Sequence, residues 1–273
     1  MHVVQTIEGF RKALDAERAQ GRVVGLVPTM GALHDGHLSL LRRAGAECDV
    51  VAVTVFVNPL QFEHADDLAS YPRDLAADAA MAAGAGVHHL FAPSAAEMHP
   101  GEMLTRVAVA RLGDGMEGSC RPGHFEGVAT VVTKLFAIAG ACRAYFGEKD
   151  YQQLTVVRRL VSDLSFPVEV VACPTVRAPD GLALSSRNVH LSGAERAAAP
   201  VLHRALAAGA AAVERGESRP ALVSLAMARI ISQEPLATLE YAEVLEEDLR
   251  WRLLVAARIG NVRLIDNIEV QAP

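Results

Sequence analysis

Short Val-rich runs alternate with longer stretches of helical periodicity through much of the chain, and this alternation constrains the fold more than any other feature. Strands that alternate with helices predict a mostly parallel sheet with helices on both of its faces. We therefore expect an α/β domain whose ligands bind beyond the carboxyl ends of the strands. The expected strands are residues 23–27, 50–57, 87–92, 143–146 and 168–172, and the expected helices are residues 38–48, 75–83, 125–139 and 150–164.

The pattern changes near residue 176, where a turn signal at residues 178–181 is followed by Ala-rich helices and then by alternating strands. The expected helices are residues 192–215 and 219–232, and the expected strands are residues 239–244 and 262–270. This combination predicts a smaller α+β unit. We therefore place residues 1–175 in a larger α/β domain and residues 176–273 in a smaller C-terminal domain.

The composition and charge argue against several classes of protein. The formal net charge is −6, whereas nucleic-acid-binding proteins usually carry an excess of basic residues. No apolar run is long enough to span a bilayer. The four cysteines are widely spaced without a CxxC pair, which indicates neither a disulfide framework nor a zinc site. The amino terminus has no signal-peptide pattern. We expect a cytoplasmic protein with no membrane and no nucleic-acid partner.

The sequence PTMGALHDGH at residues 28–37 follows an expected strand and precedes an expected helix. Such a turn presents backbone N–H groups and a helix N-terminus to an anion, and Gly31 and Gly36 allow close approach of a ligand. His34 and His37 are three residues apart, so they share a face of the first helical turn and could donate hydrogen bonds to phosphate oxygens. The alternatives are an inert surface pair or a zinc pair, although no third zinc ligand has a recognisable spacing.

The sequence FVNPLQF at residues 56–62 lies at the end of the most apolar strand. Amide side chains at this edge of a sheet are well placed to bind a hydroxyl or carboxylate group of a substrate. Asn-Pro also ends strands without any further role, so the function of Asn58 stays open, whereas Gln61 between two large apolar residues indicates substrate binding. The length and polarity of residues 59–73 predict a mobile loop.

In FGEKDYQQ, at residues 146–153, a short expected strand again runs through a glycine into a helix. Lys149 could neutralise phosphate charge, Asp150 could cap the helix or bind a ribose, and Gln153 would lie one turn into the helix. An ordinary acidic helix start with a solvated lysine explains the segment equally well.

In LALSSRN, at residues 182–188, two hydroxyl groups are followed by a guanidinium group. Ser185, Ser186 and Arg187 would supply two neutral donors and a planar cation to a phosphate. Ser and Asn are also common caps, but the position at the expected domain boundary favours a functional role.

RPGHFEG, at residues 121–127, opens a helix. Arg121 could contact an anionic group, or the Pro and Gly could simply form a turn.

The segments PTMGALHDGH, FVNPLQF, RPGHFEGV, FGEKDYQQ and LALSSRN occur in this order between residues 28 and 188. In this set the chain resembles the pantoate–β-alanine ligase family of the HIGH-motif nucleotidyltransferase superfamily. The resemblance implies a Rossmann-like N-terminal domain, a smaller C-terminal lid domain and a homodimer.

The resemblance also implies a reaction with ATP, pantoate and β-alanine as substrates. Pantoate and ATP would give pantoyl adenylate and pyrophosphate, and the amine of β-alanine would then displace AMP. Mg²⁺ is implied together with ATP. Residues 71–77 are less acidic than the family pattern, so no protein ligand for the metal is assigned to Asp74 or Asp78.

Carried over residue by residue, the resemblance assigns most of the motif positions to ATP. The implied ATP-binding residues are Pro28, Thr29, Met30, Gly31, Ala32, Leu33, His34, Asp35, Gly36, His37, Gly147, Glu148, Lys149, Asp150, Val176, Leu184, Ser185, Ser186 and Arg187. Within this set His34, His37 and Lys149 would be catalytic. Gln61 and Gln153 would bind pantoate, with Gln61 also near β-alanine.

Two other functional classes fit parts of the pattern. A nucleotidyltransferase acting on a phosphorylated acceptor would share the HxGH turn but would not need Gln61 and Gln153 as a pair. A catalytically silent nucleotide-binding module would need only the loop and could lose His37 or Lys149. A dehydrogenase fits poorly, because GDGMEG at residues 113–118 is not followed by an apolar helix.

Overall fold

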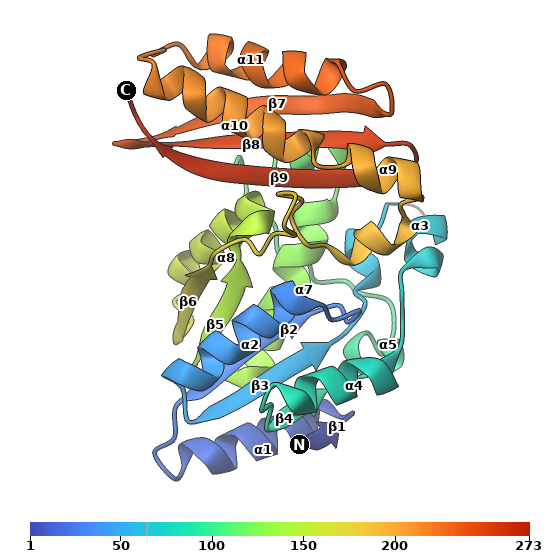
Figure 1. Ribbon diagram of the computed structural model, residues 1–273. Helices are drawn as coiled ribbons and strands as arrows, with labels where there is room; N and C mark the ends of the chain where they lie inside the picture. Colours follow the sequence, from blue (N-terminus) through green and yellow to red (C-terminus); the bar gives the residue numbers. More distant parts are fainter. Residues whose placement is uncertain (64) are drawn as a thin grey trace. The chain divides into compact units, whose positions relative to one another are not determined.

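The computed structural model describes residues 1–63 and 65–273, and these fold into two compact units (Figure 1). The first unit comprises residues 1–147 and 152–174, and the second comprises residues 148–151 and 175–273. None of the helices described is long and apolar enough to cross a membrane.

The first unit is built on a six-stranded sheet in which every pair of neighbouring strands is parallel. The spatial order is β1-β4-β3-β2-β5-β6. The strands are β1 (His2–Val4), β2 (Val24–Thr29), β3 (Val50–Val55), β4 (His89–Phe91), β5 (Cys142–Gly147) and β6 (Val168–Cys173). This architecture confirms the expected α/β class.

Helices connect the strands and cover the sheet. The longer ones are α1 (Ile7–Arg18), α2 (Asp35–Glu47), α4 (Leu75–Gly84), α7 (His124–Ala139) and α8 (Tyr151–Asp163). The short ones are η1 (Pro59–Gln61), α3 (Ala65–Ser70), α5 (Ala95–Met98) and α6 (Glu117–Cys120). Helix α1 contacts α7, and α2 contacts α4. Alternate strand residues such as Val27, Val51 and Val53 pack with Leu40 and Leu41 of α2, as expected where successive side chains point to opposite faces.

The strand order reverses between β2 and β5, and such a reversal is where open parallel sheets usually bind their ligands. From β2 the chain adds β3 and β4 on one side, whereas from β5 it adds β6 on the other. In open parallel sheets ligands bind at such a switch point, outside the carboxyl ends of the strands. Strand β2 ends at Thr29 and β5 ends at Gly147, where two of the sequence motifs lie.

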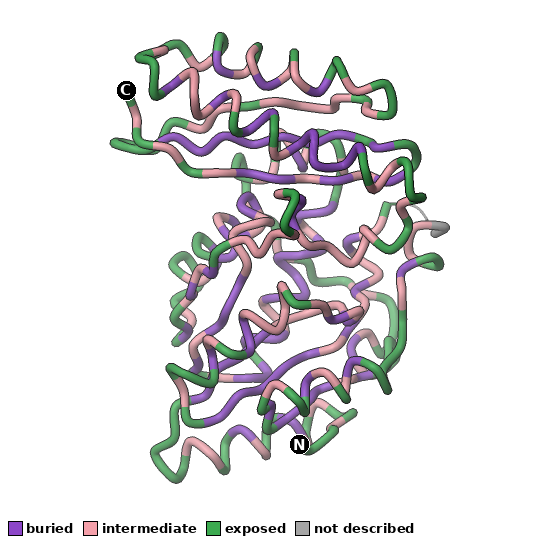
Figure 2. Tube along the Cα trace, in the orientation of Figure 1, coloured by how far each residue is buried: buried purple, intermediate pink, exposed green. Residues whose placement is uncertain are grey.

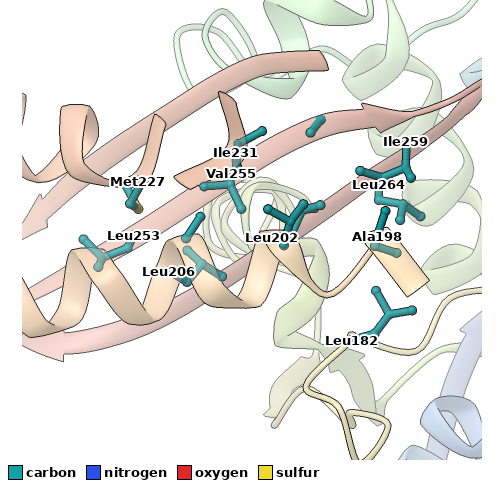
Figure 3. Packing of buried hydrophobic residues seen from close by; sticks show 14 of the residues in the cluster. Leu182, Ala198, Leu202, Leu206, Met227, Ile231, Leu253, Val255, Ile259 and Leu264 are labelled. Atoms are coloured by element: carbon teal, nitrogen blue, oxygen red, sulfur yellow. The ribbon is translucent and has the colours of Figure 1, made fainter. Parts of the chain in front are cut away.

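The second unit contains a three-stranded antiparallel sheet in the order β7-β8-β9. The strands are β7 (Ala237–Glu247), β8 (Arg250–Ile259) and β9 (Val262–Gln271), and the other elements are η2 (Glu148–Asp150), η3 (Ser186–His190), α9 (Gly193–Ala198), α10 (Val201–Glu214) and α11 (Pro220–Ser232). Strand β8 is buried along most of its length (Figure 2). Its residues Leu253 and Val255 pack with Leu202, Leu206 and Met227 from α10 and α11 (Figure 3).

The structure differs from the expected helix over residues 192–215, because α9 ends at Ala198 and α10 begins at Val201. Pro200 lies at the break, where its ring and missing N–H are tolerated at a helix start but not within a helix. The segment expected to be a mobile loop, residues 59–73, contains η1 and α3, and residue 64 within it lies outside the described residues.

Candidate active site

The loop between β2 and α2 has a left-handed backbone at two consecutive residues. Gly31 has a φ of +83° and Ala32 a φ of +50°. The first is natural for glycine, whereas the second is uncommon for a residue with a Cβ and persists only where the surroundings hold it. Inside the turn, Thr29 Oγ1 accepts a hydrogen bond from the Gly31 amide at 3.1 Å and donates to the Thr54 carbonyl at 2.6 Å.

Asp78 of α4 holds this loop in place. Its side chain is 3% exposed, and its two oxygens accept hydrogen bonds from the amides of Ala32 at 3.0 Å and Leu33 at 2.7 Å. A Cβ on Gly31 would lie 2.7 Å from Asp78 Oδ2, so the close packing requires glycine there. Sequence reasoning considered Asp78 only as a metal ligand and missed this contact. The available signal was a lone acid inside an Ala-rich helix.

His34 and His37 cap the amino terminus of α2 with their side chains. His34 Nδ1 accepts a hydrogen bond from the Gly36 amide at 3.1 Å, and His37 Nδ1 accepts one from the His34 amide at 3.3 Å. The two ring centroids are 4.2 Å apart. Because each Nδ1 accepts a hydrogen, each neutral ring carries its own proton on Nε2. The structure thus brings both predicted histidines together as oriented Nε2–H donors at a helix N-terminus.

Asn58 is buried beside Gln61 and fixes its orientation. Asn58 is 1% exposed, and its Nδ2 donates to Gln61 Oε1 at 3.1 Å and to the Gly127 carbonyl at 3.1 Å. Its Oδ1 accepts a hydrogen bond from the Leu60 amide at 3.3 Å. The sequence left the role of Asn58 open. In the structure its side chain binds the amide oxygen of Gln61 and so orients the Gln61 side chain.

The RPGHFEG segment contacts the backbone of Gln61, in the segment that follows β3. His124 Nδ1 lies 3.0 Å from the Gln61 carbonyl oxygen, to which Arg121 Nη2 also donates at 3.2 Å. Arg121 Nη1 lies 3.1 Å from His124 Nε2. Since arginine can only donate, His124 Nε2 is the acceptor and its Nδ1 is protonated. A Cβ on Gly127 would lie 2.2 Å from the Leu60 carbonyl oxygen, which explains the glycine.

The two neighbouring glutamines of α8 have different surroundings. Gln152 is buried, donates to the carbonyls of Leu112 at 2.8 Å and Gly115 at 2.9 Å, and accepts from the Glu117 amide at 3.1 Å. Gln152 therefore organises the GDGMEG loop, which has no dinucleotide-binding context. Gln153, the predicted pantoate ligand, is half-buried one position further along.

The predicted ATP-binding residues of the second unit lie on two short segments. One of these segments is η2, residues 148–150, in which Lys149 Nζ lies 3.7 Å from Asp150 Oδ1. The next residue, Tyr151, donates its hydroxyl hydrogen to the Glu247 carboxylate at 2.6 Å. Burial and this carboxylate raise the pKa of Tyr151 to about 12. Its hydroxyl therefore stays protonated at neutral pH.

In the second segment, the structure brings Val176 and Leu184 together as a backbone pair. The Leu184 amide donates to the Val176 carbonyl at 2.9 Å across the turn. Ser185 then caps η3, because its Oγ accepts from the Arg187 amide at 3.3 Å. Ser185, Ser186 and Arg187 are all half-buried.

Sequence comparison identifies one family along nearly the whole chain. A family profile described as Pantoate-beta-alanine ligase matches residues 2–269. The pantothenate synthetase of Cereibacter sphaeroides is 50% identical over 277 residues, covering 98% of this chain and 99% of the relative. That of Moorella thermoacetica is 47% identical over 280 residues, covering 99% of both.

Solved structures agree with this assignment. Pantothenate synthetase from Thermus thermophilus matches with a TM-score of 0.93 and 49% identity, covering 99% of this chain and 100% of the other. Pantoate-beta-alanine ligase from Francisella tularensis, complexed with beta-gamma ATP and beta-alanine, matches with a TM-score of 0.82 and 35% identity, covering 98% and 97%. The chain therefore belongs to the pantoate–β-alanine ligase family of ATP-dependent enzymes.

Proposed function

We propose that this chain carries out the family's reaction in two steps. In the first, a carboxylate oxygen of pantoate attacks the α-phosphorus of ATP, an O–P bond forms, and pyrophosphate leaves. In the second, the amine of β-alanine attacks the acyl carbon, the amide bond forms, and AMP leaves with the oxygen that joined it to the acyl group. A carboxylate is a poor electrophile, and adenylation provides the leaving group that amide formation needs.

The observation that carries this proposal is the pair of histidine caps at the switch point of the sheet. Adenylation develops negative charge on oxygens around the α-phosphorus, and preoriented donors stabilise such charge most effectively. The Nε2–H groups of His34 and His37 have this character, since backbone hydrogen bonds hold both rings through Nδ1. The N-terminus of α2 adds a favourable partial charge for an anion.

The remaining roles are assigned from motif positions and surroundings. In the first unit, residues 28–37, from the end of β2 to the first turn of α2, bind the nucleotide. Gln61 and Gln153 bind pantoate, and Gln61 also lies near β-alanine. Gly147 of the first unit and residues 148–150 of the second bind adenosine and phosphates, with Lys149 on a phosphate. Val176 contributes its backbone to the base or ribose. The segment Leu184–Arg187 binds the triphosphate, with the Arg187 guanidinium as its cation.

Mg²⁺ belongs to this proposal as part of the substrate MgATP. Magnesium in nucleotide enzymes is typically held by substrate phosphates and by at most one or two carboxylates. Among the residues that the structure describes, no group of three or more His, Cys, Asp or Glu side chains could hold a metal ion. Both oxygens of Asp78 already accept backbone hydrogens, so we assign no step to a protein-bound metal. We also propose a cytoplasmic homodimer.

Product analysis with omitted substrates tests this function. With MgATP and pantoate alone, we expect enzyme-bound adenylate and an amount of pyrophosphate close to the enzyme concentration. Adding β-alanine should then release AMP and amide continuously. Pyrophosphate that forms without pantoate, or no pyrophosphate with all three substrates, would contradict the proposal, and phosphorylated acceptors would then test the nucleotidyltransferase alternative.

A further inference from the structure

Asn267 of β9 binds the carbonyl groups of the two peptide bonds that flank Lys149. It is 4% exposed, and its Nδ2 donates to the carbonyl oxygens of Glu148 at 2.8 Å and Lys149 at 2.9 Å. Arg252 Nη1 donates to Asn267 Oδ1 at 3.3 Å, which fixes the orientation of the amide because arginine has no acceptor. Both amide hydrogens of Asn267 are thus used on two consecutive carbonyls of η2.

Arg252 of β8 holds the side chains of the same segment. It is 6% exposed, lies with its guanidinium carbon 4.1 Å from the ring centroid of Tyr151, and approaches Glu148 Oε2 at 3.8 Å. A second carboxylate, Glu269, pairs with Arg252 Nη2 at 2.7 Å. The η2 segment is therefore held through its backbone by Asn267 and through its flanking side chains by Arg252.

Asp266, the residue before Asn267, holds the other predicted ATP-binding segment of this unit. It is 3% exposed, and its carboxylate accepts two hydrogen bonds from Arg177, at 2.5 Å and 2.9 Å. Arg177 also donates to the carbonyls of Gly181 at 3.1 Å and Asn267 at 3.2 Å. It lies between Val176 and the turn that leads to Ser185, so the Asp266 pair sets the course of the chain into the ALSSRN segment.

Arg252 and Asn267 lie on the face of the three-stranded sheet opposite its hydrophobic core. The core cluster contains Leu253 and Val255 of β8, so Arg252 points to the opposite face of the sheet by the alternation of strand side chains. Asn267 pairs with Arg252 on that face. A buried charged pair often adds little net stability, because the cost of desolvating its charges offsets their attraction. The contacts of Asn267 and Asp266 instead fix the course of the backbone around Lys149 and before Arg187.

We propose that Asp266 and Asn267 are positioning residues for the adenylation step. Asn267 sets the position of Lys149, and Asp266 sets the path of the segment at residues 185–187. Two consecutive residues of β9 thus position both of the proposed phosphate-binding cations, Lys149 and Arg187. This inference rests on the proposed phosphate role of Lys149. It adds a pair of residues from the C-terminal sheet that touch no reacting group.

A double-mutant cycle between Asn267 and Lys149 tests the proposal. Asn267→Asp keeps the shape and the acceptor for Arg252 but removes both hydrogens directed at the η2 carbonyls, and Asn267→Ala removes the whole amide. Misplacement of a reacting group by about 1 Å costs on the order of 100-fold in rate. We expect each variant to lower kcat of pantoate-dependent pyrophosphate formation about 10- to 100-fold, with KM for pantoate unchanged.

In the Lys149→Ala background the same Asn267 substitutions should lower kcat less than about threefold, because a residue that acts through Lys149 has nothing left to position. Glu240→Gln is the matched control, since Glu240 pairs with Arg258 and Arg263 on the same sheet. Its kcat should equal that of the unmodified protein.

The outcomes separate the two claims. If Lys149→Ala retains normal turnover, the proposed role of Lys149 fails. If Lys149→Ala lowers kcat but the Asn267 variants have normal kcat, the positioning role is wrong and the proposed function stands. The same holds if the Asn267 and Lys149 substitutions lower kcat independently, so that the double variant shows the product of the two separate reductions. If Asn267→Ala fails to fold, Asn267→Asp, whose shape is unchanged, takes its place in the cycle, and normal turnover of that variant would equally overturn the proposal.

Discussion

His37 combines a structural and a proposed chemical role in one imidazole ring. Its Nδ1 accepts the His34 amide hydrogen and so completes the first turn of α2, while Nε2 carries the proton that we assign to the phosphate. Two substitutions separate these roles. The side-chain oxygen of asparagine can replace Nδ1, and the side-chain amide of glutamine reaches the position of Nε2.

We predict that His37→Asn keeps the stability of the protein but lowers the adenylation rate about 10²- to 10³-fold, the usual cost of one lost charge-stabilising donor. His37→Gln should recover part of that rate and lose about 1 kcal/mol of stability, because it lacks the capping acceptor. Single-turnover pyrophosphate release and urea unfolding measure the two quantities. Turnover of His37→Asn near that of the unmodified protein would remove His37 from the chemistry.

At this scale the sequence predicted the pairing of His34 with His37 from their spacing, because neighbours three apart share a helix face. It could not predict that both rings face the backbone through Nδ1, since ring orientation depends on the local dihedral angles. The orientation of Gln61 was equally out of reach. It depends on Asn58, whose amide is itself held by the carbonyl of Gly127, 69 residues further along the chain.

At the scale of elements, α4 stabilises a strained turn that belongs to another part of the chain. Ala32 adopts its left-handed conformation while Asp78 accepts the two amides that follow Gly31. Hydrogen bonds to a charged acceptor contribute more to stability than hydrogen bonds to a neutral one. The negative charge of Asp78 is therefore more important here than the size of its side chain. The conformation of the loop between β2 and α2 is thus linked to helix α4.

We predict that Asp78→Asn lowers the free energy of unfolding by about 2–3 kcal/mol, because its NH2 group would face an amide donor and one hydrogen bond would be lost. KM for ATP should rise roughly tenfold as the loop shifts. Asp74→Asn at the N-cap of the same helix is the control, since asparagine caps a helix as well as aspartate does. A loss of stability in Asp78→Asn with an unchanged KM for ATP would show that the contact is purely structural.

Most elements of the first unit were predictable, because strands buried on both faces read as apolar runs between helices. Strand β8 was not recognised, although it is the central strand of the second sheet. Its sequence RWRLLVAARI is buried at nearly every position, so it lacks the alternation expected of a strand with one solvated face. The break between α9 and α10 follows from Pro200, a local signal that the Ala-rich periodicity obscured.

At the scale of the whole molecule, the chain divides in a way that linear reading does not reveal. Residues 148–151 follow β5 directly, yet their contacts assign them to the second unit. Strand β9 contacts η2, and one of these contacts is the hydrogen bond between Asn267 and Glu148, which are 119 residues apart. Lys149, Val176 and Arg187 therefore belong to one unit, and His34, His37 and Gln61 belong to the other.

The central claim is that the carboxylate of pantoate attacks the α-phosphorus of ATP. Pantoate labelled with ¹⁸O in both carboxylate oxygens tests this directly when the products are analysed by mass spectrometry. The account predicts AMP that carries one ¹⁸O atom, pyrophosphate without label, and an amide that keeps the other ¹⁸O. Unlabelled AMP, or ADP together with labelled phosphate, would show attack at a different phosphorus and would contradict the acyl-adenylate mechanism.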